Sequence, residues 1–138
     1  MHFIYDTKLF HDAIQIRNEV FVHEQGFQNE FDEIDDISLH FVLYDEKAVG
    51  VCRLYYDTSK QAYILGRLAM LQSHRHLGYG SKLVQEVEKV VKKQGGTSIH
   101  LHAQCVAIPF YQRLGFIRYG EIDKDENCPH QWMKKKFK

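Results

Sequence analysis

Hydrophobic residues recur along the chain with the spacing of helices in two segments. Over residues 11–22, apolar side chains repeat every three or four positions, and Gly26 follows the end of the pattern. The same spacing over residues 83–91, ahead of the pair Gly95-Gly96, predicts a second helix that ends at those glycines. A third, short helix is predicted over 107–114.

Other segments have the alternation that is typical of strands. Residues 39–56 read as two strands joined by a turn at 45–47. Residues 62–71 are apolar on both faces, which favours a strand covered on both sides. A further strand is predicted over 97–103, and we expect a final strand pair to flank a long loop; its two strands are 117–121 and 132–136.

The order of these elements is helix, hairpin, strand, helix, strand, helix, strand pair, with a loop or short irregular helix over 24–36. This order predicts an α/β protein with a mixed sheet and helices on both faces. The length of 138 residues fits one domain, 1–138. Sequence repeats and linkers are absent.

Composition narrows the classes of function. Eighteen Lys and Arg residues balance eighteen Asp and Glu residues, which argues against a nucleic-acid binder. Three cysteines without a CxxC pair indicate a reducing compartment, and no apolar run approaches the roughly 18 residues of a membrane span. We therefore expect a cytoplasmic protein that contacts neither nucleic acid nor membrane; the sequence leaves monomer and homodimer open.

The segment SHRHLGYGSKLV, residues 73–84, combines glycines and cations at the start of a predicted helix. It is either a plain tight turn or an anion site, because the first N–H groups of a helix have no partner within it. A dinucleotide fingerprint needs Gly or Ala where Leu83 stands, and a P-loop needs Lys where Ser81 stands. The pattern that remains is R-x-x-G-x-G, over 75–80.

This pattern, with the strand GRLAML (66–71) and the stretch AQCVAIPFYQRLGF (103–116), resembles the GNAT N-acetyltransferase superfamily. VFVHEQGF and PHQWM are similar to segments of a small bacterial group within it. The resemblance implies a largely antiparallel sheet that is splayed between two central strands, with acetyl-CoA as co-substrate and no metal. It also implies the transfer of an acetyl group to a primary amine by direct attack in a ternary complex.

Roles for individual residues follow from the resemblance. Tyr111 matches the proposed general acid to the departing thiolate, and Phe110 stands beside it among the cofactor-binding residues. Gln104 occupies a position where the family often has Asn. The main chain of Leu68, Ala69 and Met70 would pair with the pantetheine, and the pyrophosphate would be surrounded by Arg75, His76, Leu77, Gly78, Tyr79, Gly80 and Ser81.

Chemistry suggests further roles. The backbone N–H of Met70 could stabilise the oxyanion. A base must take a proton from the amine, directly or through water, and the candidates are Glu24, His40, His102 and His130. His102 is the first of these, since the polar residues around it share one sheet face. The acceptor-side candidates are Glu24, Gln25, His40 and His130. Each histidine could equally be a hydrogen-bonded structural residue, and Tyr111 could be a core tyrosine.

The six acids between Glu24 and Asp36 have no Lys or Arg among them. They could form a negative rim for a cationic amine, or they could be a solvated loop. Three other functions remain open at this point: a non-catalytic acetyl-CoA sensor, a metal-binding module built on the pairs His74/His76 and His100/His102, and a thiol enzyme that uses Cys105.

Overall fold

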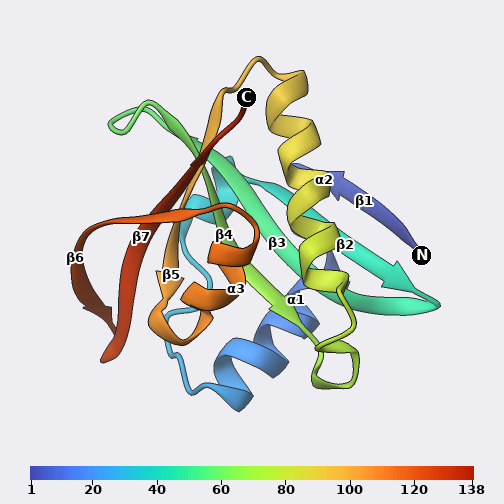
Figure 1. Ribbon diagram of the computed structural model, residues 1–138. Coiled ribbons are helices and arrows are strands. Elements are labelled where there is room, and N and C mark those ends of the chain that lie inside the picture. The colour runs from blue at the N-terminus through green and yellow to red at the C-terminus, as the bar shows by residue number, and fades with distance from the viewer.

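The computed structural model describes residues 1–138 and contains one sheet and three α-helices (Figure 1). The strands are β1 (His2–Asp6), β2 (Leu39–Asp45), β3 (Lys47–Asp57), β4 (Ala62–Met70), β5 (Ser98–Gln104), β6 (Ile117–Asp125) and β7 (Cys128–Lys136). The α-helices are α1 (His11–Arg17), α2 (Tyr79–Lys93) and α3 (Ile108–Arg113). A π-helical segment, Asn18–Glu24, continues α1, and a 3₁₀ turn spans Glu33–Ile37.

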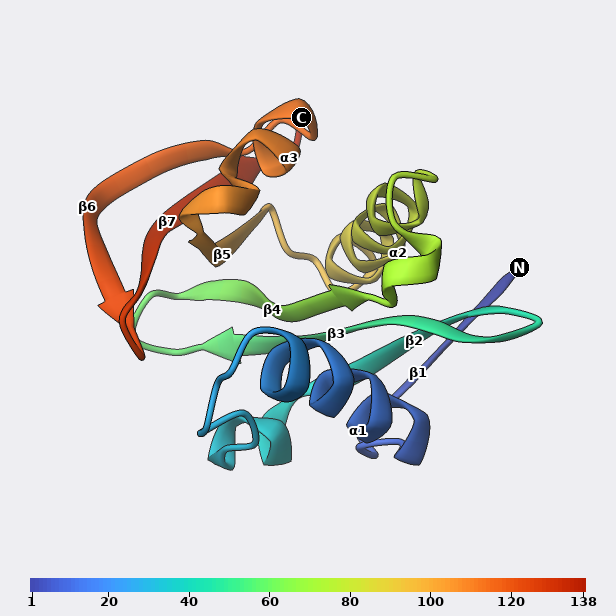
Figure 2. The same cartoon turned by 90° about the horizontal axis from the view of Figure 1, so that it is seen from below.

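The seven strands are ordered β1-β2-β3-β4-β5-β7-β6, and all neighbours are antiparallel except β4 and β5. That parallel pair is short: Tyr63, Ile64 and Leu65 face 99–101, and the two strands then separate. Figure 2 shows β4 and β5 diverging from this point. The expected fold, a mixed and largely antiparallel sheet that is splayed between two central strands, is confirmed.

The helices lie on both faces of the sheet, as the element order predicted. In Figure 2, α1 lies below β2 and β3, whereas α2 and α3 lie above the sheet. The apolar stripe of α2 points into the larger core, where Leu83, Val84 and Val87 are fully buried. A smaller core between α1 and the sheet contains Ile16 and Val20. The two cores hold the splayed sheet in place from opposite sides.

The structure differs from the sequence-based expectation at both edges of the sheet. The strand β1 was missed, and the final strands are longer than 117–121 and 132–136. They are joined not by a long loop but by a tight turn at Glu126 and Asn127, which have φ angles of 49° and 68°. The prediction made β6 too short because β6 is an exposed edge strand. Almost none of its side chains is buried, so it needs no apolar alternation.

Gly96, between α2 and β5, offers a test of this packing. A Cβ atom at this position would overlap Val91 Cγ1 and lie 2.8 Å from Tyr63 Cε2. We expect Gly96→Ala to lower the free energy of unfolding by about 1–3 kcal/mol, because an overfilled core forces side chains off their rotamers. Thermal unfolding measures the loss. Gln94→Ala, an exposed neighbour, is the control, and equal stability of the two variants would contradict the packing described here.

Candidate active site

A cleft of about 840 Å³ opens where β4 and β5 diverge. One wall is the second half of β4, from Leu65 to Met70, and the other is the end of β5, from Leu101 to Gln104. The start of α2, the start of α3, the segment that follows α1 and the turn between β6 and β7 also line the cleft. Both central strands therefore present free backbone edges to one cavity, which is wide enough for an extended ligand.

The N-terminus of α2 reaches this cleft without a side-chain cap. Gly78 stands at the N-cap with φ 83°, a left-handed conformation that glycine adopts without strain. The first N–H groups of α2 are therefore free of helical partners, and Gly78, Gly80 and Ser81 line the cleft. A Cβ atom on Gly80 would lie 3.2 Å from the Phe110 ring, so this glycine allows α2 and α3 to approach closely. The arrangement suits an anion.

The loop before α2 is fastened to the rest of the protein by two side chains. Arg75 donates from Nη1 and Nη2 to the Glu24 carboxylate at 2.6 and 2.8 Å, and from Nε to the Met70 carbonyl at 3.0 Å. The Tyr79 hydroxyl donates to Asp45 at 2.7 Å. Arg75 and His76 line the cleft, whereas Leu77, Tyr79 and Glu24 do not. The contacts of Glu24 and Tyr79 show that these two side chains anchor the loop.

The β4 wall contains a bulge that redirects its backbone. The register with β3 shifts between Val51 and Arg53, opposite Arg67, which has φ 52°. Beyond the bulge, the Leu71 N–H donates to the Val49 carbonyl at 2.9 Å. Because successive N–H groups of a strand point to opposite sides, the Met70 N–H points away from β3, toward the edge that β5 has left. A donor is thus available at the cleft.

Tyr111 lies in α3 at the floor of the cleft, 9% exposed, and packs edge-on against Phe110 and Phe116. Burial raises the pKa of the Tyr111 phenol above its usual value, with a smaller contribution from Cys52. The side chain is thus protonated at neutral pH, as a proton donor must be. The core packing expected of a structural tyrosine and the cleft position expected of an acid occur together at this residue.

His102 lies in the middle of a stack of three rings that begins in the cleft. Its Nε2 is 2.6 Å from Asp123 Oδ1, and its ring stacks on those of His130 and Trp132, with centroids 4.6 and 5.0 Å apart. His130 Nδ1 lies 2.8 Å from the Cys128 carbonyl and therefore carries the proton of that hydrogen bond. Both His102 and His130 line the cleft.

Gln25 and Gln104 meet across the cleft. Gln104 Nε2 donates to Gln25 Oε1 at 2.8 Å, which links the end of β5 to the residue after the π-helical segment. Both side chains line the cleft. The amide of Gln104, expected to contact the cofactor, is thus already hydrogen-bonded to a residue expected on the acceptor side.

Comparison with known proteins is consistent with this cleft. Residues 8–116 match the model of the acetyltransferase (GNAT) family. The uncharacterized N-acetyltransferase YjcF of Bacillus subtilis is 38% identical over 129 residues, which cover 90% of each chain.

Among solved structures, an acyl-CoA N-acyltransferase from Pseudomonas aeruginosa superposes with a TM-score of 0.82 at 24% identity, over 98% of this chain and 99% of the other. An aminoglycoside 6′-N-acetyltransferase complexed with coenzyme A gives 0.75 at 17% identity, over 99% and 97%. At these sequence identities, the two similarities show a shared fold.

The chain belongs to the GNAT family of acetyltransferases. The resemblance drawn from the glycine loop, the strand GRLAML and the stretch AQCVAIPFYQRLGF is confirmed, and the protein is an acyltransferase. None of its helices is long and apolar enough to cross a membrane. The His, Cys, Asp and Glu side chains form no group of three or more that could hold a metal ion, and Cys105 does not line the cleft.

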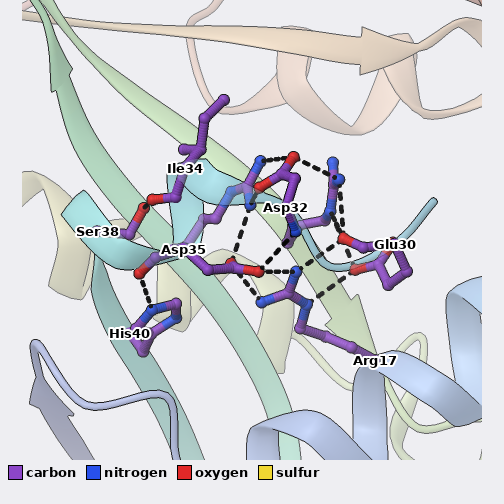
Figure 3. Close-up of polar contacts among 9 residues, drawn as sticks. Arg17, Glu30, Asp32, Ile34, Asp35, Ser38 and His40 are labelled. Atoms are coloured by element: carbon purple, nitrogen blue, oxygen red, sulfur yellow. Dashed lines mark hydrogen bonds and ion pairs between the residues drawn. The ribbon is translucent and has the colours of Figure 1, made fainter.

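The acidic segment of this GNAT protein is mostly folded inward (Figure 3). The 2% exposed Arg17 side chain donates from Nε to Glu30 Oε2 and from Nη1 to Asp35 Oδ1, both at 2.8 Å. Arg53 donates to Asp32 at 2.7 Å and to Asp35 at 2.9 Å. Figure 3 shows Glu30 and Asp35 converging on the guanidinium group of Arg17. We use the name arginine–carboxylate cluster for the set Arg17, Arg53, Arg67, Glu30, Asp32 and Asp35.

The main part of the acidic segment is therefore neither a solvated loop nor a row of unpaired charges. Glu30, Asp32 and Asp35 are paired with arginines that come from α1, β3 and β4, far away in the sequence. Glu33 and Asp36 are exposed and make no ion pair. His40, a candidate acceptor-side residue, is 1% exposed, bonds the Asp35 carbonyl at 2.9 Å and does not line the cleft. Its role is to support the cluster.

Acid titration should reveal the cluster. Burial alone would raise the pKa of Asp35, but hydrogen bonds and charge from Arg17 and Arg53 outweigh it and lower the pKa from 3.8 to about 2. Because the folded pKa lies below the unfolded one, the stabilisation is present above about pH 4 and is lost as the pH falls toward about 2. We expect the free energy of unfolding to drop over that interval.

Asp35→Asn removes this titration and breaks a buried pair, so it should lower the free energy of unfolding at neutral pH by about 3–5 kcal/mol and flatten the acid dependence. Denaturant unfolding at a series of pH values measures both effects. Asp36→Asn, at the exposed neighbour, is the control. An unchanged acid profile in Asp35→Asn would contradict the assignment.

Proposed function

We propose that the protein transfers an acetyl group from acetyl-CoA to a small primary amine by direct attack in a ternary complex. The observation that carries the proposal is the cleft between β4 and β5, which ends at the uncapped N-terminus of α2. The diphosphate of acetyl-CoA would bind there, and its pantetheine would run along Leu68, Ala69 and Met70. The coenzyme A complex of a GNAT protein with this fold supports the choice of donor.

Two groups on the cleft wall would carry the chemistry. The free N–H of Met70 would donate to the oxyanion that forms when the amine attacks the thioester carbonyl. The buried Tyr111 phenol, which is protonated at neutral pH, would give its proton to the sulfur as the C–S bond breaks. Holding both substrates in one cleft would supply much of the acceleration.

The amine would enter from the end of the cleft away from α2, which is lined by Phe27, Asn29, Glu126 and His130. Glu126 fixes this end, since its carboxylate accepts the backbone N–H groups of Gln28 and Asn29 at 2.8 and 2.9 Å. This end of the cleft is therefore held in a fixed shape by hydrogen bonds, which suits a small and specific acceptor.

Calorimetry with coenzyme A and a thiol-release assay with acetyl-CoA test the proposal together. The amine panel would contain an alkyl monoamine, a diamine, an amino sugar and a dipeptide. Saturable binding and thiol release with at least one amine are expected. Binding without release from any amine would favour the non-catalytic sensor, and the absence of binding would remove the proposal.

Tyr111→Phe should lower kcat about 10²-fold with little change in the affinity for coenzyme A, because only the proton donor is lost. Steady-state kinetics and calorimetry measure the two quantities. The control is Tyr119→Phe, whose hydroxyl bonds His100 at 2.7 Å outside the cleft lining. If Tyr111→Phe and Tyr119→Phe turn over equally fast, Tyr111 is not the acid.

A further inference from the structure

Glu30 differs from the other paired acids of its segment in one respect. Both carboxylate oxygens of Glu24, Asp32 and Asp35 accept hydrogen bonds from arginines. On Glu30, Oε2 accepts Nε of Arg17 at 2.8 Å and faces Nε of Arg67 at 3.0 Å, and the backbone carbonyl accepts further bonds from both arginines. Its Oε1 has no partner in the protein.

That oxygen is not sealed in the core. The only buried side-chain nitrogen or oxygen atom without a hydrogen-bond partner in the protein is Arg53 Nε. Since Glu30 Oε1 has no partner either, it must retain contact with the outside. The residue is 4% exposed and lines the cleft. The free oxygen of a nearly buried carboxylate is therefore presented to the cavity, while the rest of the side chain is immobilised by two arginines.

Glu30 also lies on the side of the cleft from which an amine would approach. A diphosphate at the tip of α2 would sit beyond the C-terminal end of β4, so the pantetheine and its thioester would lie along the wall formed by Leu68, Ala69 and Met70. Arg67, which holds Glu30, directly precedes Leu68. The free carboxylate oxygen is thus at the end of this wall away from α2.

We infer that Glu30 is the catalytic base that binds the ammonium group of the acceptor and takes its proton. The inference rests on the proposed function. Sequence reasoning named His102 for this role. Its Nε2 bonds Asp123 and its ring stacks on those of His130 and Trp132, and the variant His102→Gln tests it against Glu30. Burial raises the pKa of Glu30 above its ordinary value in spite of Arg67 and Arg17, which makes the carboxylate a stronger base.

The protons and electrons of the reaction balance with this assignment. The ammonium gives one proton to Glu30 Oε1 and becomes a neutral amine, whose lone pair forms the C–N bond. When the C–S bond breaks, its electron pair goes to sulfur, which takes the proton of Tyr111. The nitrogen then gives its second proton to the Tyr111 phenolate, and Glu30 releases its proton to water. The products are the N-acetylated amine and coenzyme A thiol.

The test compares Glu30→Gln with Glu33→Gln, an exposed acid of the same segment, for each amine of the panel that the wild type turns over. At neutral pH, Glu30→Gln should lower kcat/KM about 10²-fold, and Glu33→Gln should leave it unchanged. The loss should shrink as the pH rises, because the amine then arrives already neutral. The charged groups around Glu30 that enter the pH profile are Arg17, Arg53, Arg67, Asp32, Asp35 and Glu126.

Glu30→Asp covers the case in which Glu30→Gln does not fold, because it keeps the negative charge but withdraws the oxygen by one methylene. It should slow the reaction of a protonated alkylamine at least tenfold more than that of O-methylhydroxylamine, which is neutral at neutral pH. Equal slowing of both amines, or a pH-dependent loss in His102→Gln but not in Glu30→Gln, would overturn the inference. The proposed function fails separately, if the wild type itself releases no thiol.

Discussion

The early separation of β4 and β5 is the constraint on which the site depends. Neighbouring parallel strands normally satisfy each other's backbone groups, but here the pairing stops at Leu65 and Leu101. Past that point, the Met70 N–H and the first N–H groups of α2 have no strand or helix partner. Unpaired backbone groups are costly when they are dry, so this edge is adapted to a ligand that supplies hydrogen bonds.

Ion pairs fix the acidic segment that contains Glu30 at the rim of the cleft. Three arginines, from α1, β3 and β4, draw a loop of opposite charge onto the sheet. Ion pairs that leave water lose much of their Coulomb gain to desolvation, so the benefit of the arginine–carboxylate cluster lies in geometry more than in stability. Bidentate contacts between guanidinium and carboxylate groups fix orientation, and they place residues 30–35 against the bulge at Arg67.

The fold followed from local patterns, whereas the partners of individual side chains did not. The stripe of α2 and the glycines at its two ends are visible in the sequence, because helix periodicity and termination are local properties. The edge strand β6 was placed too short because exposed strands carry no apolar alternation. The pairing of Arg17 with Glu30 and Asp35 spans 13 and 18 residues and depends on tertiary structure. The acidic run has no cations of its own, so its sequence suggested only a negative rim or a solvated loop.

The acidic segment therefore contains two kinds of paired carboxylate. They differ in how many of their oxygens accept hydrogen bonds from arginines. Glu24 and Asp35 have both oxygens bonded to arginines, so neither can accept a proton without losing an ion pair. Glu30 keeps Oε1 free while Oε2 holds the side chain still. A base must combine fixed position with an open lone pair, and within the segment only Glu30 meets both conditions. The surrounding arginines therefore position this carboxylate without neutralising its reactive oxygen.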